Sequence, residues 1–279
     1  MRKQWGNNEE TKYTPTVTKY ESKLIIENAP WALYTLFIMK KNVLIFDFDG
    51  TIADTFRYTL ELSNRISSEF NFNKIEPHEV EILKDKTSQE VIRYLHVPLL
   101  KIPKIVARAK WELSQQITLI EPAQGLREVL VHLKSFGHEM GILTSNSLEN
   151  VIKFLNNHEL NLFDFVSASS RIWGKNKCLN NLIQDKGFNP QEVLYIGDET
   201  RDIVAAKKAG IRIAAVTWGY NSLKALQSYC PDCLVHKPEE LFQYIADLSV
   251  NPVKETKFSN GVNKNSSPLG DSTPMAIMK

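Results

Sequence analysis

Two aspartates that follow a short apolar run are the residues of this 279-residue sequence best suited to chemistry. The run, residues 43–46, is too short for a stable helix, and its β-branched and aromatic residues predict a buried strand. Asp47 and Asp49 come next, and side chains two apart on a strand point the same way, so both carboxylates can reach one site. Gly50 then permits a sharp turn. Two such acids repel each other unless a cation or proton lies between them, so the pair predicts a divalent metal site; an Asx-rich turn after a core strand is the alternative.

Two further predicted strands also end in polar clusters. One is followed by Thr144, Ser145 and Asn146, and the other by Asp198 and Asp202. The carboxyl ends of parallel strands open into one crevice, so we expect all three clusters to converge. Acids beside hydroxyl and amide groups suit a phosphoryl group held by Mg²⁺, which prefers carboxylate oxygens and water at about 2.1 Å. The first aspartate of each acidic cluster is the expected ligand.

The elements that must position these clusters alternate between strand and helix. This alternation predicts an α/β protein with a doubly wound parallel sheet. Between residues 54 and 120 the patterns are helical and no strand is expected, which predicts an inserted α-helical cap domain. The expected strands are 43–46, 140–143, 163–166, 192–196, 212–217 and 233–236. The expected helices are 54–70, with Asp54 as N-cap, 79–83, 88–95, 105–117, 126–136, 148–157, 177–186 and 203–209.

The domain organisation follows from these elements. We expect an N-terminal extension over 1–38, an α/β core over 39–54 and 121–250, a helical cap over 55–120 and a disordered tail over 251–279, which is rich in polar residues, glycine and proline. Met39 stands just before the first strand. It is either the natural start of the protein, or the preceding segment is a partly ordered arm.

The composition is that of a globular protein, with 43% hydrophobic and 24% charged residues. A net charge of +2 predicts no nucleic-acid or membrane partner, and the apolar stretch at residues 31–39 is far too short to span a bilayer. Three cysteines make no disulfide framework, so a reducing, cytoplasmic location is expected. The sequence leaves the oligomeric state open.

The motifs resemble those of the haloacid dehalogenase (HAD) superfamily over about residues 40–240. Asp-Phe-Asp-Gly-Thr stands at 47–51, Thr-Ser-Asn at 144–146, a lysine follows, and Gly-Asp-Glu-Thr-Arg-Asp stands at 197–202. The helical insertion after the first motif resembles the phosphoglycolate phosphatase-like branch. The resemblance implies a HAD-like Rossmannoid core.

The resemblance also implies residue roles. Asp47 would be the nucleophile that forms an aspartyl-phosphate, and Asp49 would protonate the leaving oxygen and later activate water. Mg²⁺ would be held by Asp47, the backbone carbonyl of Asp49, and Asp198. Asp202 would orient the metal's waters or the lysine rather than bind the metal.

The phosphoryl oxygens would be bound by Thr144, Ser145 and Asn146. The lysine, which neutralises charge beside the nucleophile, is harder to assign because the Lys-Pro context frequent in the family is missing here. Lys175 follows a glycine and is preferred, and Lys177 is the alternative.

These features predict a Mg²⁺-dependent phosphatase that acts on a small, phosphoglycolate-like phosphomonoester. The second acid, Asp49, argues against a dehalogenase. A phosphosugar mutase would use the same core residues and is the first alternative, and a non-catalytic binding protein on this core is the second.

The expected cap would select the substrate by closing over the site. Its basic residues either bind a second anionic group of the substrate or lie on solvated helix faces, and Trp111 is expected in the core. The basic residues concerned are Arg57, Lys84, Lys86 and Arg93.

Overall fold

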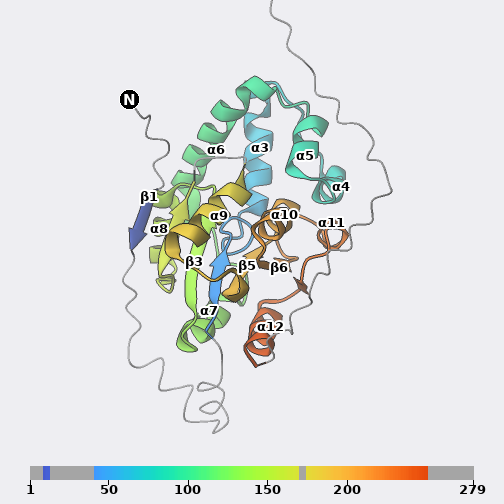
Figure 1. Cartoon of the computed structure of the whole chain (residues 1–279). Helices are drawn as coiled ribbons and strands as arrows, with labels where there is room; N and C mark the ends of the chain where they lie inside the picture. Colours follow the sequence, from blue (N-terminus) through green and yellow to red (C-terminus); the bar gives the residue numbers. More distant parts are fainter. Residues whose placement is uncertain (1–8, 13–40, 170–173, 251–279) are drawn as a thin grey trace, which may run out of the picture.

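A seven-stranded sheet lies at the centre of the computed structural model, which describes residues 9–12, 41–169 and 174–250 (Figure 1). The strand order is β1-β4-β3-β2-β5-β6-β7. Strands β2 to β7 run parallel to their neighbours, and β1 pairs antiparallel with β4 at one edge. The strands are β1 Glu9–Lys12, β2 Val43–Phe46, β3 Glu139–Thr144, β4 Phe165–Ala168, β5 Val193–Gly197, β6 Arg212–Val216 and β7 Cys233–Val235.

Strand β2 occupies the middle of the sheet, between β3 and β5. The chain passes from β2 to β3 and β4 on one side and returns to β5 on the other. This reversal places a crevice at the carboxyl end of β2, where open α/β sheets bind ligands. Leu44 and Phe46 pack into one core cluster and Ile45 into another, so the strand is buried on both faces, which explains its unbroken apolar run.

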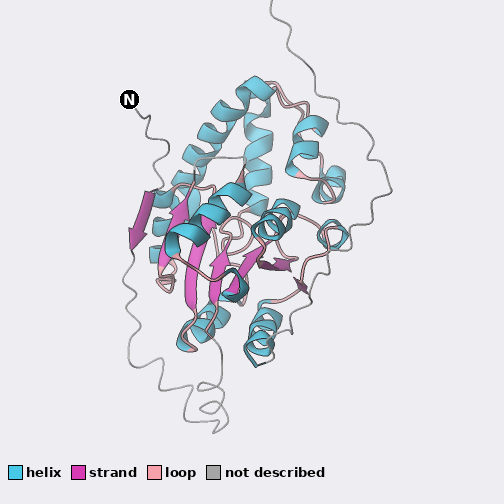
Figure 2. Ribbon diagram, viewed as in Figure 1, coloured by secondary structure: helices cyan, strands magenta, loops and turns pink. Residues whose placement is uncertain are grey.

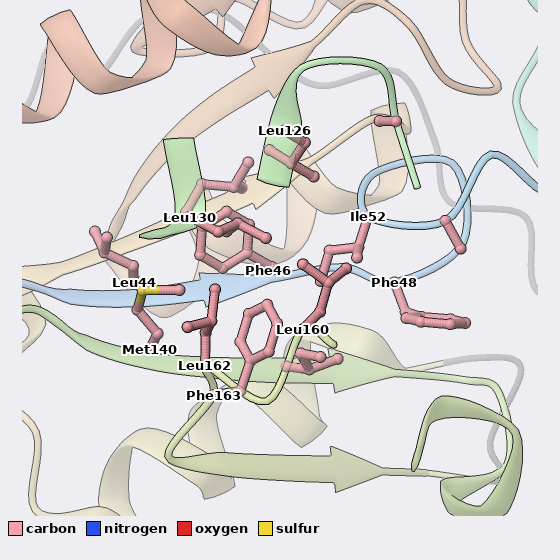
Figure 3. Close-up of a cluster of buried hydrophobic side chains, with 14 of the residues drawn as sticks. Leu44, Phe46, Phe48, Ile52, Leu126, Leu130, Met140, Leu160, Leu162 and Phe163 are labelled. Carbon is pink, nitrogen blue, oxygen red and sulfur yellow. The ribbon is translucent and has the colours of Figure 1, made fainter. Parts of the chain in front are cut away.

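Helices cover both faces of the sheet in a three-layer arrangement (Figure 2). One face packs against α7, α8 and α12, and Figure 3 shows the side chains of this cluster around Phe46 and Leu130. The other face packs against α9, α10 and α11. The doubly wound α/β fold is therefore confirmed. These helices are α7 Leu126–Ser135, α8 Leu148–Asn157, α9 Lys175–Lys186, α10 Thr200–Ala209, α11 Leu223–Ser228 and α12 Pro238–Val250.

The segment between β2 and β3 is helical, and we refer to its four α-helices as the insert helices. They stand beyond the end of the sheet toward which the parallel strands point (Figure 1). Leu62, Ile66 and Phe70 form a small cluster of their own, separate from the two core clusters. The segment comprises α3 Phe56–Phe70, η1 Pro77–Glu79, α4 Val80–Lys84, α5 Ser88–Tyr94, η2 Leu99–Lys101, α6 Ile102–Gln116 and η3 Ile117–Leu119.

Several expectations need correction. Trp111 is not in the core, because 56% of it is exposed. Its ring centroid lies 5.2 Å from Cζ of the Arg108 guanidinium. The N-cap of α3 is Thr55 rather than Asp54, because the turn after β2 continues one residue further. Helix α9 begins at Lys175 rather than Lys177.

One strand and two α-helices were not expected from the sequence, namely β1, α11 and α12. Strand β1 is polar because it is an edge strand, held by backbone pairing and with charged residues typical of such edges. Before residue 41 the structure describes only Glu9–Lys12, which form β1. Met39 and the tail over 251–279 lie outside the described residues.

No helix within the described ranges is long and apolar enough to cross a membrane. Cys178, Cys230 and Cys233 carry free thiols.

Candidate active site

The carboxylates of Asp47 and Asp49 lie where β2 ends, as the strand geometry predicts. Asp47 is 3% exposed, and its backbone N–H donates to the carbonyl of Ile196 on β5. Its Oδ1 accepts a hydrogen bond from the Phe48 amide at 2.8 Å. Burial raises the pKa of Asp47 to about 7, against the lowering effect of Lys175. Burial also raises the pKa of Asp49 to about 6, and a hydrogen bond from Asn146 opposes that shift.

Lys175 is the lysine that reaches these acids. Its Nζ lies 2.5 Å from Asp47 Oδ2 and 2.5 Å from Asp202 Oδ1. It also stands 5.3 Å from the ring centroid of the buried Tyr195. Burial lowers the pKa of Lys175, but the charges of Asp202 and Asp47 outweigh burial and leave it well above its ordinary value. Lys177, two residues further along the same helix, is exposed.

Asp198 is fully buried at the end of β5, and close backbone packing holds it there. Its Oδ1 accepts from the Thr51 hydroxyl at 2.7 Å, and its Oδ2 accepts from the Tyr220 amide at 2.7 Å. A Cβ on Gly50 or on Gly219 would come within 2.4 or 2.2 Å of Asp198 Oδ2. Only glycine therefore fits at either position.

The acids form a donor set that fits a hard divalent cation. Carboxylate oxygens of Asp47, Asp198 and Asp202 all lie within 4.8 Å of one another. Burial and the neighbouring acids raise the pKa of Asp198 well above its ordinary value. Oxygen-rich, carboxylate sites of this kind are those that Mg²⁺ prefers. Like the oxygens of the other two acids, both oxygens of Asp202 accept hydrogen bonds, here from Lys175 and from the Glu199 amide.

The polar cluster after β3 joins the same crevice. The Thr144 hydroxyl is buried and accepts from the Asn146 backbone amide at 2.9 Å. The Asn146 side chain donates to both oxygens of Asp49, at 3.1 and 3.2 Å. Its carbonyl accepts from Asn150, which fixes the orientation of the amide. In this structure Asn146 therefore contacts the acid, and Ser145 lines the open cavity.

Three residues of this region were not singled out from the sequence. Arg201 pairs with Glu199, and it lines a cavity beside Asp49 together with Tyr220 and Asn221, which follow β6. Tyr220 donates its amide to Asp198, while its hydroxyl hydrogen-bonds Thr59 at 2.8 Å. The sequence offers a signal for Arg201, because it stands between Asp198 and Asp202 in the same motif. No local signal identifies the other two, because their contacts with the insert segment, from Tyr220 to Thr59 and from Asn221 to Lys84, join residues more than 100 positions apart.

Asn221 connects the insert helices to the core. Its amide donates to the carbonyls of Lys84 and Lys86, both at 2.9 Å, and its Oδ1 accepts from the Thr200 amide. The Ser222 amide also donates to the Lys84 carbonyl at 2.9 Å. The loop between α4 and α5 is therefore fastened to the loop that holds Asp198.

The four basic residues considered for substrate recognition divide into two pairs. Lys84 and Lys86 line a cavity next to Asp49. Arg57 is exposed and pairs with Glu61 on the next turn of α3, and Arg93 is exposed on α5. The structure thus brings only the two lysines to the crevice.

Comparison with known proteins places this fold and site in a family. The model of the haloacid dehalogenase-like hydrolase family matches residues 44–216, from β2 to the end of β6. The chain therefore belongs to the haloacid dehalogenase-like hydrolases, and it is a hydrolase of the phosphatase kind, as the sequence motifs predict.

This chain matches two curated relatives over nearly their whole length. A phosphoglycolate phosphatase from Synechococcus elongatus is 32% identical over 206 residues, which is 74% of this chain and 97% of the relative. The pyrophosphatase PpaX of Bacillus cereus is 25% identical over 221 residues, which is 76% of this chain and 99% of the relative.

Solved structures support the fold. A predicted phosphatase from Clostridium acetobutylicum matches with a TM-score of 0.65 at 18% identity and covers 75% of this chain and 99% of its own. A haloacid dehalogenase-like family protein from Streptococcus pneumoniae matches with a TM-score of 0.62 at 21% identity, over 73% of this chain and 98% of its own.

Proposed function

We propose that this protein hydrolyses small phosphomonoesters through a phosphorylated Asp47. The observation that carries the proposal is the meeting of the Asp47 carboxylate with the Lys175 ammonium at 2.5 Å, beside a second acid on the same strand end. A nucleophile, a charge-neutralising lysine and a proton donor are the groups that phosphoryl transfer requires.

In the first step a carboxylate oxygen of Asp47 attacks phosphorus, and the bond from phosphorus to the ester oxygen breaks. Asp49 gives its proton to the departing alcohol. In the second step Asp49 takes a proton from water, whose oxygen attacks phosphorus. The bond from phosphorus to the Asp47 oxygen breaks, which frees the Asp47 carboxylate and releases inorganic phosphate. The raised pKa of Asp49, about 6, supports this role because a larger fraction of the carboxyl then stays protonated near neutral pH.

The remaining residues hold the phosphoryl group and the acids. Lys175 neutralises charge on the phosphoryl oxygens, and Thr144 and Ser145 donate hydrogen bonds to them. Asn146 acts through its amide on Asp49, whose orientation it sets.

The metal site consists of the Asp47 and Asp198 carboxylates together with the Asp49 backbone carbonyl. The carboxylate set fits Mg²⁺, which when bound would neutralise the phosphoryl charge. Residues 55–120 act as a cap domain that excludes water from the site, on a core of residues 39–54 and 121–250.

The substrate class rests on the relatives. Phosphoglycolate is the first ester to test, because the Synechococcus relative is a phosphoglycolate phosphatase, and pyrophosphate is the second, because the Bacillus relative is a pyrophosphatase. We also propose a reducing, cytoplasmic setting, which the free thiols support.

The test is phosphate release from p-nitrophenyl phosphate and a panel of phosphomonoesters, with Mg²⁺, with EDTA, and with Asp47→Asn. We expect release that needs the metal and that Asp47→Asn abolishes. Conversion of a phosphosugar into its isomer without phosphate release would identify a mutase instead. Turnover that survives in Asp47→Asn would contradict the role of the nucleophile, and a complete lack of turnover would favour a binding protein.

A further inference from the structure

A cavity of about 450 Å³ begins at the carboxylate of Asp49 and extends between the insert helices. Its floor is formed by core residues that include Ser145, Asn146 and Arg201. The proton donor of the proposed reaction therefore stands at one end of a space that continues away from the metal ligands. The group that leaves from phosphorus must lie on this side.

The walls of this cavity are mostly aliphatic. All four insert helices contribute branched or small apolar side chains that face inward. They include Leu60 and Leu62 of α3, Leu83 of α4, Val91 of α5, and Val106 and Ala109 of α6. Polar side chains gather where the cavity meets the acids.

Lys84 and Lys86 also line the cavity, and aromatic rings lie beside their ammonium groups. The Nζ of Lys84 lies 4.8 Å from the centroid of the Phe56 ring, and that of Lys86 lies 5.5 Å from the centroid of the Tyr94 ring. Each ammonium thus already lies over an aromatic face. Lys110 stands near Asp49, at the polar end, and burial lowers its pKa.

We propose that the preferred substrate is a phosphomonoester of an extended apolar alcohol, alkyl or aryl, whose organic part fills the cavity between the insert helices. The inference rests on the proposed phosphatase function and narrows its substrate class. The volume lies in the range of pockets that enclose drug-sized ligands, so the two carbons of glycolate would leave most of it unfilled. An apolar organic part would also bury more of its surface against the aliphatic walls than glycolate would.

The proposal predicts how activity depends on chain length. Each methylene moved from water into an apolar site improves binding by about fourfold. The value of kcat/KM for n-alkyl phosphates should therefore rise from ethyl to hexyl by roughly this factor per carbon, until the cavity is full. The alcohols from ethyl upward have similar acidity, so the chemical step itself changes little along the series.

The experiment measures phosphate release by the full chain with Mg²⁺ from methyl, ethyl, butyl and hexyl phosphate, phosphoglycolate and pyrophosphate. A matched pair of variants on α6 tests the location. Ala109→Phe puts a ring into the cavity, whereas Ala107→Phe puts the same ring on the exposed side of the same helix. We expect Ala109→Phe to flatten the rise with chain length and Ala107→Phe to keep both the rise and the activity on methyl phosphate.

The outcomes separate the two proposals. Release from the esters with no rise along the alkyl series, or a tenfold preference for phosphoglycolate or pyrophosphate over hexyl phosphate, would overturn the apolar substrate and leave the phosphatase function standing. No release from any compound would overturn both. If Ala109→Phe does not fold by circular dichroism, the wild-type series decides alone, and Val91→Phe on α5 replaces the variant.

Discussion

At the scale of single residues, the site depends on buried charges that balance one another. Lys175 lies between Asp47 and Asp202, and neither acid has more than a few per cent of its surface exposed. A buried ion pair is sensitive to the loss of one member, because the other charge is then left without compensation. The two lysines near the start of α9 therefore have different expected effects.

Lys175→Met should lower kcat/KM for phosphomonoesters by about 10²- to 10³-fold, which is the usual effect of removing one charge-stabilising group. Lys177→Met, the matched control on the exposed side of α9, should stay within about twofold of wild type. Steady-state kinetics on both variants, with circular dichroism to check folding, make the comparison. Equal losses in the two variants would assign the role to neither lysine.

Close packing at Gly219 gives a second prediction at this scale. Gly219→Ala brings a methyl group within 2.2 Å of Asp198 Oδ2, so the carboxylate must move. We expect the apparent Mg²⁺ affinity, measured by titrating activity and by calorimetry, to fall at least tenfold.

Gly187→Ala serves as its control. That residue has φ +67°, with nothing within 4 Å of the added methyl, so the change costs about 1–2 kcal/mol of backbone strain without touching the site. A similar loss of Mg²⁺ affinity in Gly187→Ala would mean that general destabilisation, and not the position of Asp198, is responsible.

At the scale of elements, two of the contacts that hold the insert helices over the sheet can be compared. Asn221 is 5% exposed and bonds two carbonyls of the α4–α5 loop. Lys224 pairs with Asp85 of the same loop at 2.7 Å, but its side chain is 83% exposed. Buried hydrogen bonds and exposed ion pairs differ in energy, so the two contacts are unequal although they fasten the same loop.

Asn221→Ala should lower the free energy of unfolding by about 1–3 kcal/mol and speed hydrogen exchange of the amides of residues 84–88. Lys224→Ala should change the stability far less than Asn221→Ala, because the ion pair is exposed. Urea unfolding and exchange measured by mass spectrometry test both. Faster exchange in Lys224→Ala than in Asn221→Ala would reverse this ranking.

The turn between α7 and β3 gives a pH dependence. His138 is 2% exposed, and its Nδ1 accepts from the Asn42 amide at 3.1 Å, which requires the neutral ring. Burial lowers the pKa of His138 from 6.5 to about 4. Between these values the unfolded chain binds the proton and the folded protein does not, so stability falls as the pH drops from 6.5 toward 4, by about 3 kcal/mol in total.

His138→Gln removes this titration while keeping an acceptor for Asn42. The difference in unfolding free energy between wild type and His138→Gln, measured in urea at pH 7 and pH 4.5, should therefore shift in favour of the variant at the lower pH. A difference that does not change with pH would show that His138 does not titrate in this way.

At the scale of the whole molecule, metal binding should couple to stability. Of the acids in the buried cluster, Asp47 follows β2, whereas Asp198 and Asp202 lie far along the chain, after β5 and on α10, so only folding brings them together. A ligand that binds the folded state at 100 times its Kd adds about 2.7 kcal/mol, or on the order of 5–10 °C in Tm for a domain of this size. Mg²⁺ should raise the Tm by such an amount, and EDTA should remove the rise. Asp198→Asn should respond little to Mg²⁺, and an undiminished rise in that variant would place the metal elsewhere.

The sequence by itself determined the architecture and the kind of chemistry. Apolar runs of four to six residues read directly as central strands because parallel strands are buried on both faces, and β2, β3, β5 and β6 lie where these runs do. The motif from Asp47 to Thr51, together with the motif from Gly197 to Asp202, indicated the family without any knowledge of contacts. Asp47 and Asp49 both follow directly after β2, as the sequence predicts.

The tertiary structure decided what depends on contacts between distant residues. Lys175 reaches Asp47 across 128 positions of the chain. This contact distinguishes Lys175 from Lys177, which lies on the same helix but is exposed. Tyr220 and Asn221 look like ordinary loop residues until their partners on other elements are known. Trp111 fits an apolar helical pattern, yet it faces solvent because the helices around α6 do not cover that side. The cavity among the insert helices likewise arises from the packing of four separate helices, which no local pattern records.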